Sequence, residues 1–220
     1  MKSLQVASIM MGLALAGGMR AGTSRFDGPQ TGAVPKAVTI AEGLAEDIQA
    51  DLEARNWTMA HTRLAELQKN RSALRIEVVP TSKISGYEVA LDSLSAQVER
   101  QDQPAALQSA NRMSRKIVGV MGGYDVTIPV QVGYLDVAGR DAIYGAESGR
   151  WQDASAAAAE LHANYAIVRA HVAGKDSILD GRMRQQLNEL DAAVAAKAAA
   201  RVRTTATALL GDVDLIERTY

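Results

Sequence analysis

The sequence MRQQLNELDAAVAAKAAARVRTTATALLGDVDLI at residues 183–216 decides the fold class. Its apolar residues recur at steps of four and three, which is the spacing of one face of an α-helix. These apolar positions are Met183, Leu187, Leu190, Val194, Ala198, Val202, Ala206, Leu209, Val213 and Ile216. The chain is also rich in alanine and has only 4% aromatic residues, a composition that favours close-packed helices over β-strands. We therefore expect an all-α protein.

Turn residues divide the rest of the chain into long helical segments. They cluster at residues 79–86, 122–129 and 173–177, and we expect the folded part to begin near Lys36. The pattern predicts four segments.

Three of these four segments are interrupted near their middle, at Asn56, Asp102 and Gly149. Asn56 and Asp102 suit the N-cap of a helix, where the side chain accepts a hydrogen bond from a backbone N–H group. The fourth segment has Lys197 at the corresponding point, within an alanine-rich sequence that shows no break. We therefore expect four long, locally broken helices in place of eight short ones.

An internal repeat relates the two halves of the chain, residues 36–124 and 130–220. Trp57 and Trp151 lie 94 residues apart in similar surroundings, and we expect both to pack against the core beside a helix break. Seven residues also match at an offset of 96: Leu91, Leu94, Ala96, Val98, Ala110, Ile117 and Tyr124 correspond to Leu187, Leu190, Ala192, Val194, Ala206, Val213 and Tyr220. The predicted fold is an up-and-down four-helix bundle of long, locally broken helices, built from a duplicated helix pair.

The first 21 residues resemble a signal peptide. Lys2 provides a positive start, residues 4–15 are mostly apolar, and small residues allow cleavage after Ala16 or Ala21. The apolar run is too short to span a bilayer comfortably. We expect residues 1–21 to be removed, which predicts a periplasmic or secreted protein without a stable membrane span.

Residues 22–35 are rich in Gly, Pro, Ser and Thr and are expected to form a flexible lead-in to a single helical domain at 36–220. The chain has no cysteine, which excludes disulfides, thiolate metal sites and lipid attachment at a cysteine. Lys and Arg total 24 against 25 Asp and Glu, so no basic surplus points to nucleic acid.

Metal or haem binding in a helical bundle needs ligands that converge from facing helices. The three histidines, His61, His162 and His171, are expected to be separate residues at the surface or at the edge of an apolar face, and no cofactor is predicted. A haem or metal carrier is the alternative, with these histidines and Met59, Met113, Met121 and Met183 as candidate ligands.

The most unusual stretch is residues 128–146, which is apolar over more than one helical face. It contains an isolated polar set, and the candidate binding residues are Tyr134, Asp136, Arg140, Asp141 and Tyr144. The simplest interpretation is a well-packed helix with a surface ion pair between Asp136 and Arg140, which lie four residues apart. As a functional hypothesis, this helix is either the most buried one, with a polar cluster inside, or part of a docking face.

No combination of nucleophile, base and orienting group is recognisable, so the sequence predicts no catalytic residues and no enzyme. We expect an exported helical-bundle protein that acts through binding, with an unknown protein partner in the cell envelope. A second alternative is an enzyme that uses the carboxylates of Asp136 and Asp141.

Overall fold

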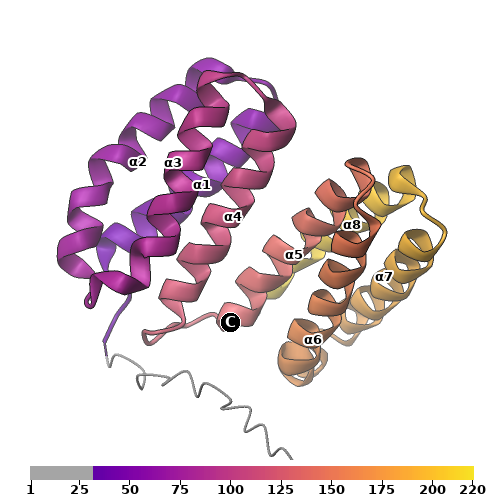
Figure 1. The fold of residues 1–220 in the computed structure, drawn as a ribbon. Coiled ribbons are helices and arrows are strands. Elements are labelled where there is room, and N and C mark those ends of the chain that lie inside the picture. Colours follow the sequence, from indigo (N-terminus) through magenta and orange to yellow (C-terminus); the bar gives the residue numbers. More distant parts are fainter. Residues whose placement is uncertain (1–31) are drawn as a thin grey trace, which may run out of the picture.

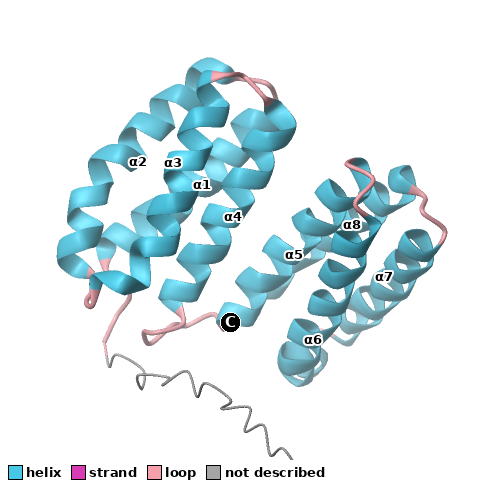
Figure 2. Ribbon diagram, in the orientation of Figure 1, coloured by secondary structure: helices cyan, strands magenta, loops and turns pink. Residues whose placement is uncertain are grey.

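A computed structural model describes residues 32–220 of the chain, and these residues fold almost entirely into helices (Figures 1 and 2). The elements are α1 (Lys36–Glu53), α2 (Trp57–Glu77), a short 3-10 helix η1 (Thr81–Ile84), α3 (Ser85–Glu99), α4 (Gln103–Met121), α5 (Val130–Glu147), α6 (Trp151–Lys175), α7 (Ser177–Ala195) and α8 (Ala199–Glu217). The all-α prediction is confirmed. The expected signal peptide at 1–21, and the lead-in up to residue 31, lie outside the described residues.

The prediction of four long helices is wrong, because each expected segment is two helices joined by a tight turn. The turns centre on Arg55, Gln101, Gly149 and Lys197, all of which have a positive φ between 51° and 69°. Three of the turns were expected. The fourth, at Lys197, was not.

All four turns have the same hydrogen bonds. At the Lys197 turn, the N–H of Ala198 donates to the carbonyl of Ala193, and the N–H of Lys197 donates to the carbonyl of Val194, both at 3.0 Å. This is the Schellman arrangement, which satisfies the last carbonyls of a helix and stops it. The alanine-rich sequence around Lys197 therefore does not continue as one helix, although alanine has the highest helix propensity.

The helices form two groups of four that stand side by side (Figure 1). We call α1 to α4 the first unit and α5 to α8 the second unit. The bounds of α1 and α5 match at an offset of 94 residues, and those of α4 and α8 match at 96. The predicted four-helix bundle from a duplicated helix pair is not confirmed, because each half of the described chain contains four α-helices of its own.

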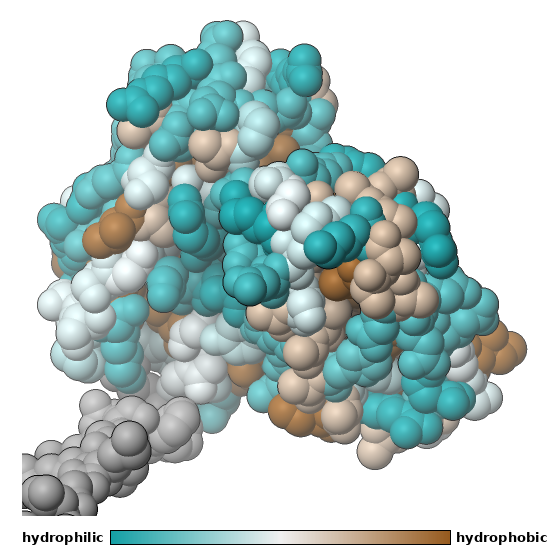
Figure 3. All heavy atoms as spheres, turned by 45° about the vertical axis from the view of Figure 1, so that its right-hand side comes forward, coloured by the Kyte–Doolittle hydropathy of each residue, from teal (hydrophilic) through white to brown (hydrophobic). Residues whose placement is uncertain are grey.

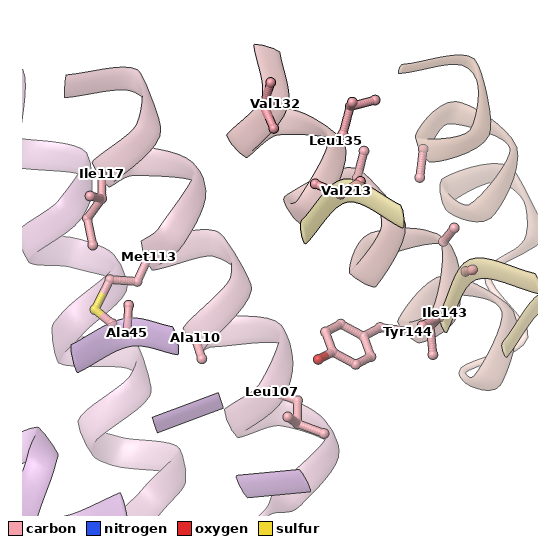
Figure 4. Packing of buried hydrophobic residues seen from close by; sticks show 14 of the residues in the cluster. Ala45, Leu107, Ala110, Met113, Ile117, Val132, Leu135, Ile143, Tyr144 and Val213 are labelled. Carbon is pink, nitrogen blue, oxygen red and sulfur yellow. The ribbon is translucent and has the colours of Figure 1, made fainter. Parts of the chain in front are cut away.

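The two units share a continuous apolar core, and the contact between them runs mainly between α4 and α5. Figure 4 shows Tyr144 pointing from α5 towards α4, with Leu107 and Ala110 opposite. Trp57 and Trp151 are partly buried against the core beside their turns, as predicted.

The face of the molecule seen in Figure 3 is mostly hydrophilic, with apolar side chains interspersed among the polar ones. None of the helices in residues 32–220 is both long enough and apolar enough to cross a membrane.

Candidate functional site

The five candidate residues on α5 occupy the most buried helix of the structure but do not form one cluster. Asp136 and Arg140 form an ion pair one helical turn apart and line a cavity of about 210 Å³. Asp141 and Tyr144 line a different cavity, of about 310 Å³. The two carboxylates of the enzyme alternative, Asp136 and Asp141, therefore lie in separate pockets.

Asp141 is part of a polar contact between the units. Its carboxylate accepts a hydrogen bond of 2.7 Å from Nδ2 of the fully buried Asn111 and one of 2.8 Å from the guanidinium of Arg115. Arg115 also pairs with Glu160 on α6, and its guanidinium lies 6.0 Å from the centre of the Tyr134 ring. Burial by itself would lower the pKa of Arg115, but the hydrogen bonds to Glu160 and Asp141 outweigh it and raise that pKa.

This contact fixes α4 against α5 and α6, because one guanidinium binds a carboxylate from each of these two helices of the second unit. Asn111 strengthens it by donating to the backbone carbonyl of Val137 at 2.9 Å. Its residues serve to join the units.

Tyr144 joins the units at a second point. Its hydroxyl accepts a 2.9 Å hydrogen bond from Nε2 of Gln49 on α1, and both side chains are buried. Burial raises the pKa of Tyr144 to about 12, so the phenol remains neutral at physiological pH. This side chain is a packed contact within the protein.

A larger cavity than these two lies between α1, α4, α5 and α8. It has a volume of about 480 Å³ and is closed at one end by the connection from Asp125 to Pro129. It shares Glu42, Glu46 and Glu217, among other residues, with the 210 Å³ cavity at Asp136 and Arg140. The two cavities therefore form one cleft, which we call the inter-unit cleft.

The inter-unit cleft has an apolar end and an acidic middle. The apolar end includes Val118 and Met121 from α4, Ile128 from the connection and Val130 from α5. The carboxylates of Glu42, Glu46 and Glu217 come next, contributed by α1 and α8.

The carboxylates of the cleft are held in an unfavourable setting. Burial, together with the nearby charges of Glu46 and Glu217, raises the pKa of Glu42 to about 7. Burial also raises the pKa of Glu46, with Arg140 opposing the rise and the charges of Asp47 and Asp214 adding to it.

Glu217 shows the same effect, because burial and the negative charges of Glu46 and Asp214 raise its pKa. Glu46 and Glu217 nevertheless remain open to solvent at the surface of the cleft, and Glu42 is half-buried. The three carboxylates are therefore crowded but accessible.

Glu42, Glu46 and Glu217 were not predicted from the sequence, because single carboxylates on amphipathic helices are typical of solvated faces. One signal was available in the repeat. At an offset of 94 residues, Glu42 and Glu46 correspond to Asp136 and Arg140, which were predicted as binding residues. The second unit has an ion pair where the first has two acids.

The three histidines of the metal or haem alternative have separate neighbours. His61 lies 3.7 Å from the carboxylate of Glu99, and His162 lies 2.8 Å from that of Asp191. His171 stacks on the C-terminal Tyr220, with ring centroids 3.9 Å apart. Within residues 32–220, no group of three or more His, Cys, Asp or Glu side chains is placed to hold a metal ion.

Comparison with known proteins adds no further assignment. No family model matches the sequence, and neither the search of curated proteins nor that of solved structures gave a match.

Proposed function

We propose that this chain is an exported binding protein, without catalytic activity, that takes part of a protein partner into the inter-unit cleft. The observation that carries this proposal is the cleft itself. It combines a volume of about 480 Å³, which lies in the usual range of ligand sites, with apolar walls and a small set of polar groups.

The electrostatics of the cleft support a binding role. Like charges that raise one another's pKa are unfavourable in the free protein, and a partner that supplies positive charge or hydrogen-bond donors relieves the repulsion. The charged residues on α5 that were predicted as binding residues already form ion pairs within the protein, since Asp136 pairs with Arg140 and Asp141 pairs with Arg115.

Export is supported by the leader-like residues 1–21. Mass spectrometry of the intact chain from the envelope or secreted fraction of its native host tests this part. We expect a chain that starts directly after Ala16 or Ala21, whereas a full-length chain would contradict cleavage of a signal peptide.

The internal repeat is also part of the proposal, now with four helices as its unit. The equal bounds of α1 and α5 and of α4 and α8, and the four similar turns, support a duplication of the whole four-helix unit. The cleft would then lie between corresponding faces of the two copies, since α1 and α4 face α5 and α8 across it.

Blocking the cleft tests the binding function. Gly43 is an exposed residue of α1 that lines the cleft, and a Cβ atom added to it meets no atom within 4 Å. Gly43→Trp therefore places an indole in the cleft without a clash at the backbone. Gly174 on α6 is equally open and exposed, so Gly174→Trp is a matched control for a new surface tryptophan.

Each variant is produced in the native host, crosslinked in place and purified, and its partners are identified by mass spectrometry. We expect a specific partner to be recovered with the unchanged chain and with Gly174→Trp, and to be lost with Gly43→Trp. Recovery of the same partner with all three proteins would place its binding site outside the cleft and overturn the proposal.

A further inference from the structure

We propose that the segment bound in the inter-unit cleft is a short, basic, amphipathic stretch of the partner, with a large apolar residue next to Arg or Lys. This inference rests on the proposed function and specifies the chemistry of the partner. It follows from the charge, the apolar surface and the length of the cleft.

The charge of the cleft is far more negative than that of the chain. Six acidic residues line the two cavities, and Arg140 is the one basic residue among their described linings. The acidic residues are Glu42, Glu46, Asp125, Asp136, Asp214 and Glu217. One positive and six negative side chains give a formal net charge of −5, whereas the whole chain has −1.

The single cation does not neutralise this surplus, because Arg140 is already paired with Asp136. Glu42, Glu46 and Glu217 take part in none of the ion pairs found among the described residues. A cleft of this charge attracts a basic segment and repels an acidic one.

The apolar end determines the second feature of the partner. Ile128 is 37% exposed at this end, whereas Val118 is almost completely buried and forms the inner wall. An apolar side chain placed against them removes further apolar surface from water, at about 25 cal/mol per Å². A purely polar cation would leave this surface exposed.

The length of the cleft limits the segment to a few residues. Val130 lines its apolar end and Arg140 lines the other end, ten residues further along α5. A helix rises about 1.5 Å per residue, so the cleft is about 15 Å long. An extended peptide of four or five residues has this length at about 3.3 Å per residue.

Selection from a random peptide library tests the proposed chemistry and does not require the partner itself. A phage-displayed hexapeptide library is selected on the whole chain, with the Gly43→Trp chain present in solution as competitor to remove peptides that bind elsewhere. We expect enriched peptides to combine one or two Arg or Lys residues with an adjacent large apolar residue.

The enriched peptides are then synthesised, and their dissociation constants are measured by fluorescence anisotropy. The decisive variant is Glu46→Arg, which gives the first unit the acid–base pair that Asp136 and Arg140 form in the second. We expect it to weaken binding at least tenfold. Glu66→Arg, at an exposed position of α2 that does not line the cleft, makes the same charge change and should weaken binding less than twofold.

Several results would overturn this inference. They are enrichment of acidic or uncharged peptides, enrichment of basic peptides without an apolar residue, equal affinity for the Glu46→Arg chain, and no enrichment at all. Acidic or uncharged peptides that Gly43→Trp still excludes would overturn only the chemistry of the partner and leave the proposed function in place. Retention of the native partner by Gly43→Trp would overturn the proposed function itself.

Discussion

The two units have corresponding helices and turns, yet they differ at the positions that face each other. Where the second unit has the ion pair of Asp136 and Arg140, the first has Glu42 and Glu46, two carboxylates of the same charge. The carboxylate of the second unit is paired with a cation, whereas burial and the negative charge of Glu46 raise the pKa of Glu42 in the first unit. At these corresponding positions, therefore, the first unit contributes two acids without an ion-pair partner to the inter-unit cleft, whereas the second unit contributes an ion pair.

The packing of the first two helices also differs between the units. Gly145 brings α5 close to α6, because a Cβ atom there would lie 2.8 Å from the backbone nitrogen of Ala154. The corresponding residue of the first unit is Asp51, at an offset of 94. The second unit therefore has a glycine at a close approach of α5 to α6, and the first unit has a residue with a side chain at the corresponding position.

The largest expected effect comes from removing this close approach. Gly145→Ala places a methyl group against the backbone of α6, which cannot move away as a side chain can, and we expect a loss of about 2–3 kcal/mol in the free energy of unfolding. Urea denaturation measures it. Gly43→Ala in the first unit has open space, so the same change there should stabilise the protein by up to about 1 kcal/mol through helix propensity. Equal effects at both positions would contradict the close packing of α5 on α6.

A second difference concerns the link between the units. Arg115 on α4 binds Asp141 and Glu160 of the second unit, whereas the corresponding residue on α8 is Gly211, 96 residues later. The link is therefore one-sided. It holds the units together along α4 and α5 and leaves the inter-unit cleft on the side of α1 and α8.

Arg115→Met removes this link and leaves two partly buried carboxylates without their cation. Because all three groups are still partly exposed to solvent, we expect a moderate loss of about 1–2 kcal/mol in the free energy of unfolding. Arg112→Met is the matched control, since Arg112 is exposed and donates a hydrogen bond to Ser109 within its own helix. The control should lose less than about 0.5 kcal/mol, and an equal loss in both variants would show that the link contributes nothing.

The crowded carboxylates predict a pH dependence. Glu42 keeps its proton up to pH about 7 in the folded chain, compared with 4.5 for an unperturbed side chain. The folded state therefore binds more protons than the unfolded state between these values, and the contribution of Glu42 to the free energy of unfolding falls as the pH rises from 4.5 to 7. The penalty is complete above pH 7 and absent below pH 4.5.

Glu42→Gln removes this penalty. Because Glu42 is partly exposed, we expect the variant to be more stable than the unchanged protein by only about 1 kcal/mol at about pH 8, with the difference disappearing at about pH 4. Urea denaturation at both pH values measures the effect, and Glu66→Gln on α2 serves as the control without a pH-dependent gain. A difference that stays constant over this pH range would contradict the raised pKa.

Much of the fold could be predicted from the sequence, because apolar periodicity and capping residues are local signals. Asn56 and Asp102 do cap their helices, each accepting a 3.3 Å hydrogen bond from a backbone N–H group. The turn at Lys197 lacks such a residue, since Ala198 occupies the N-cap of α8. The repeat was the remaining signal, because Lys197 follows Gln101 by 96 residues.

The candidate site was harder to predict from the sequence, because it depends on which helical faces meet. The sequence identified α5 as unusual, and its most buried position explains the apolar surroundings of Asp136 and Asp141. Whether a charged residue is paired depends on other helices, and no local pattern shows that Arg115 reaches Asp141 or that Glu217 lies near Glu42. Carboxylates that are far apart in the sequence are seen to be close in space only when the two units are placed together.

The smallest expected effect distinguishes directly between a continuous fourth helix and the broken one. Lys197 has a φ of 51° at its turn, and Gly149 has 69° at the turn that precedes α6. A lysine in the left-handed region costs about 1–2 kcal/mol, and a glycine there avoids this strain at the expense of a more flexible unfolded chain. We therefore expect Lys197→Gly to raise the free energy of unfolding by about 0.5 kcal/mol.

A continuous helix predicts the opposite sign for the same change, because glycine inside a helix destabilises it by about 1 kcal/mol relative to alanine. Lys197→Ala, measured beside it by urea denaturation, separates the loss of the exposed lysine side chain from the backbone effect. If Lys197→Gly is more stable than Lys197→Ala, the chain turns at this residue, and α7 and α8 are two separate helices like α3 and α4 in the first unit. If it is less stable, the fourth helix continues through Lys197 and the correspondence between the units fails at this turn.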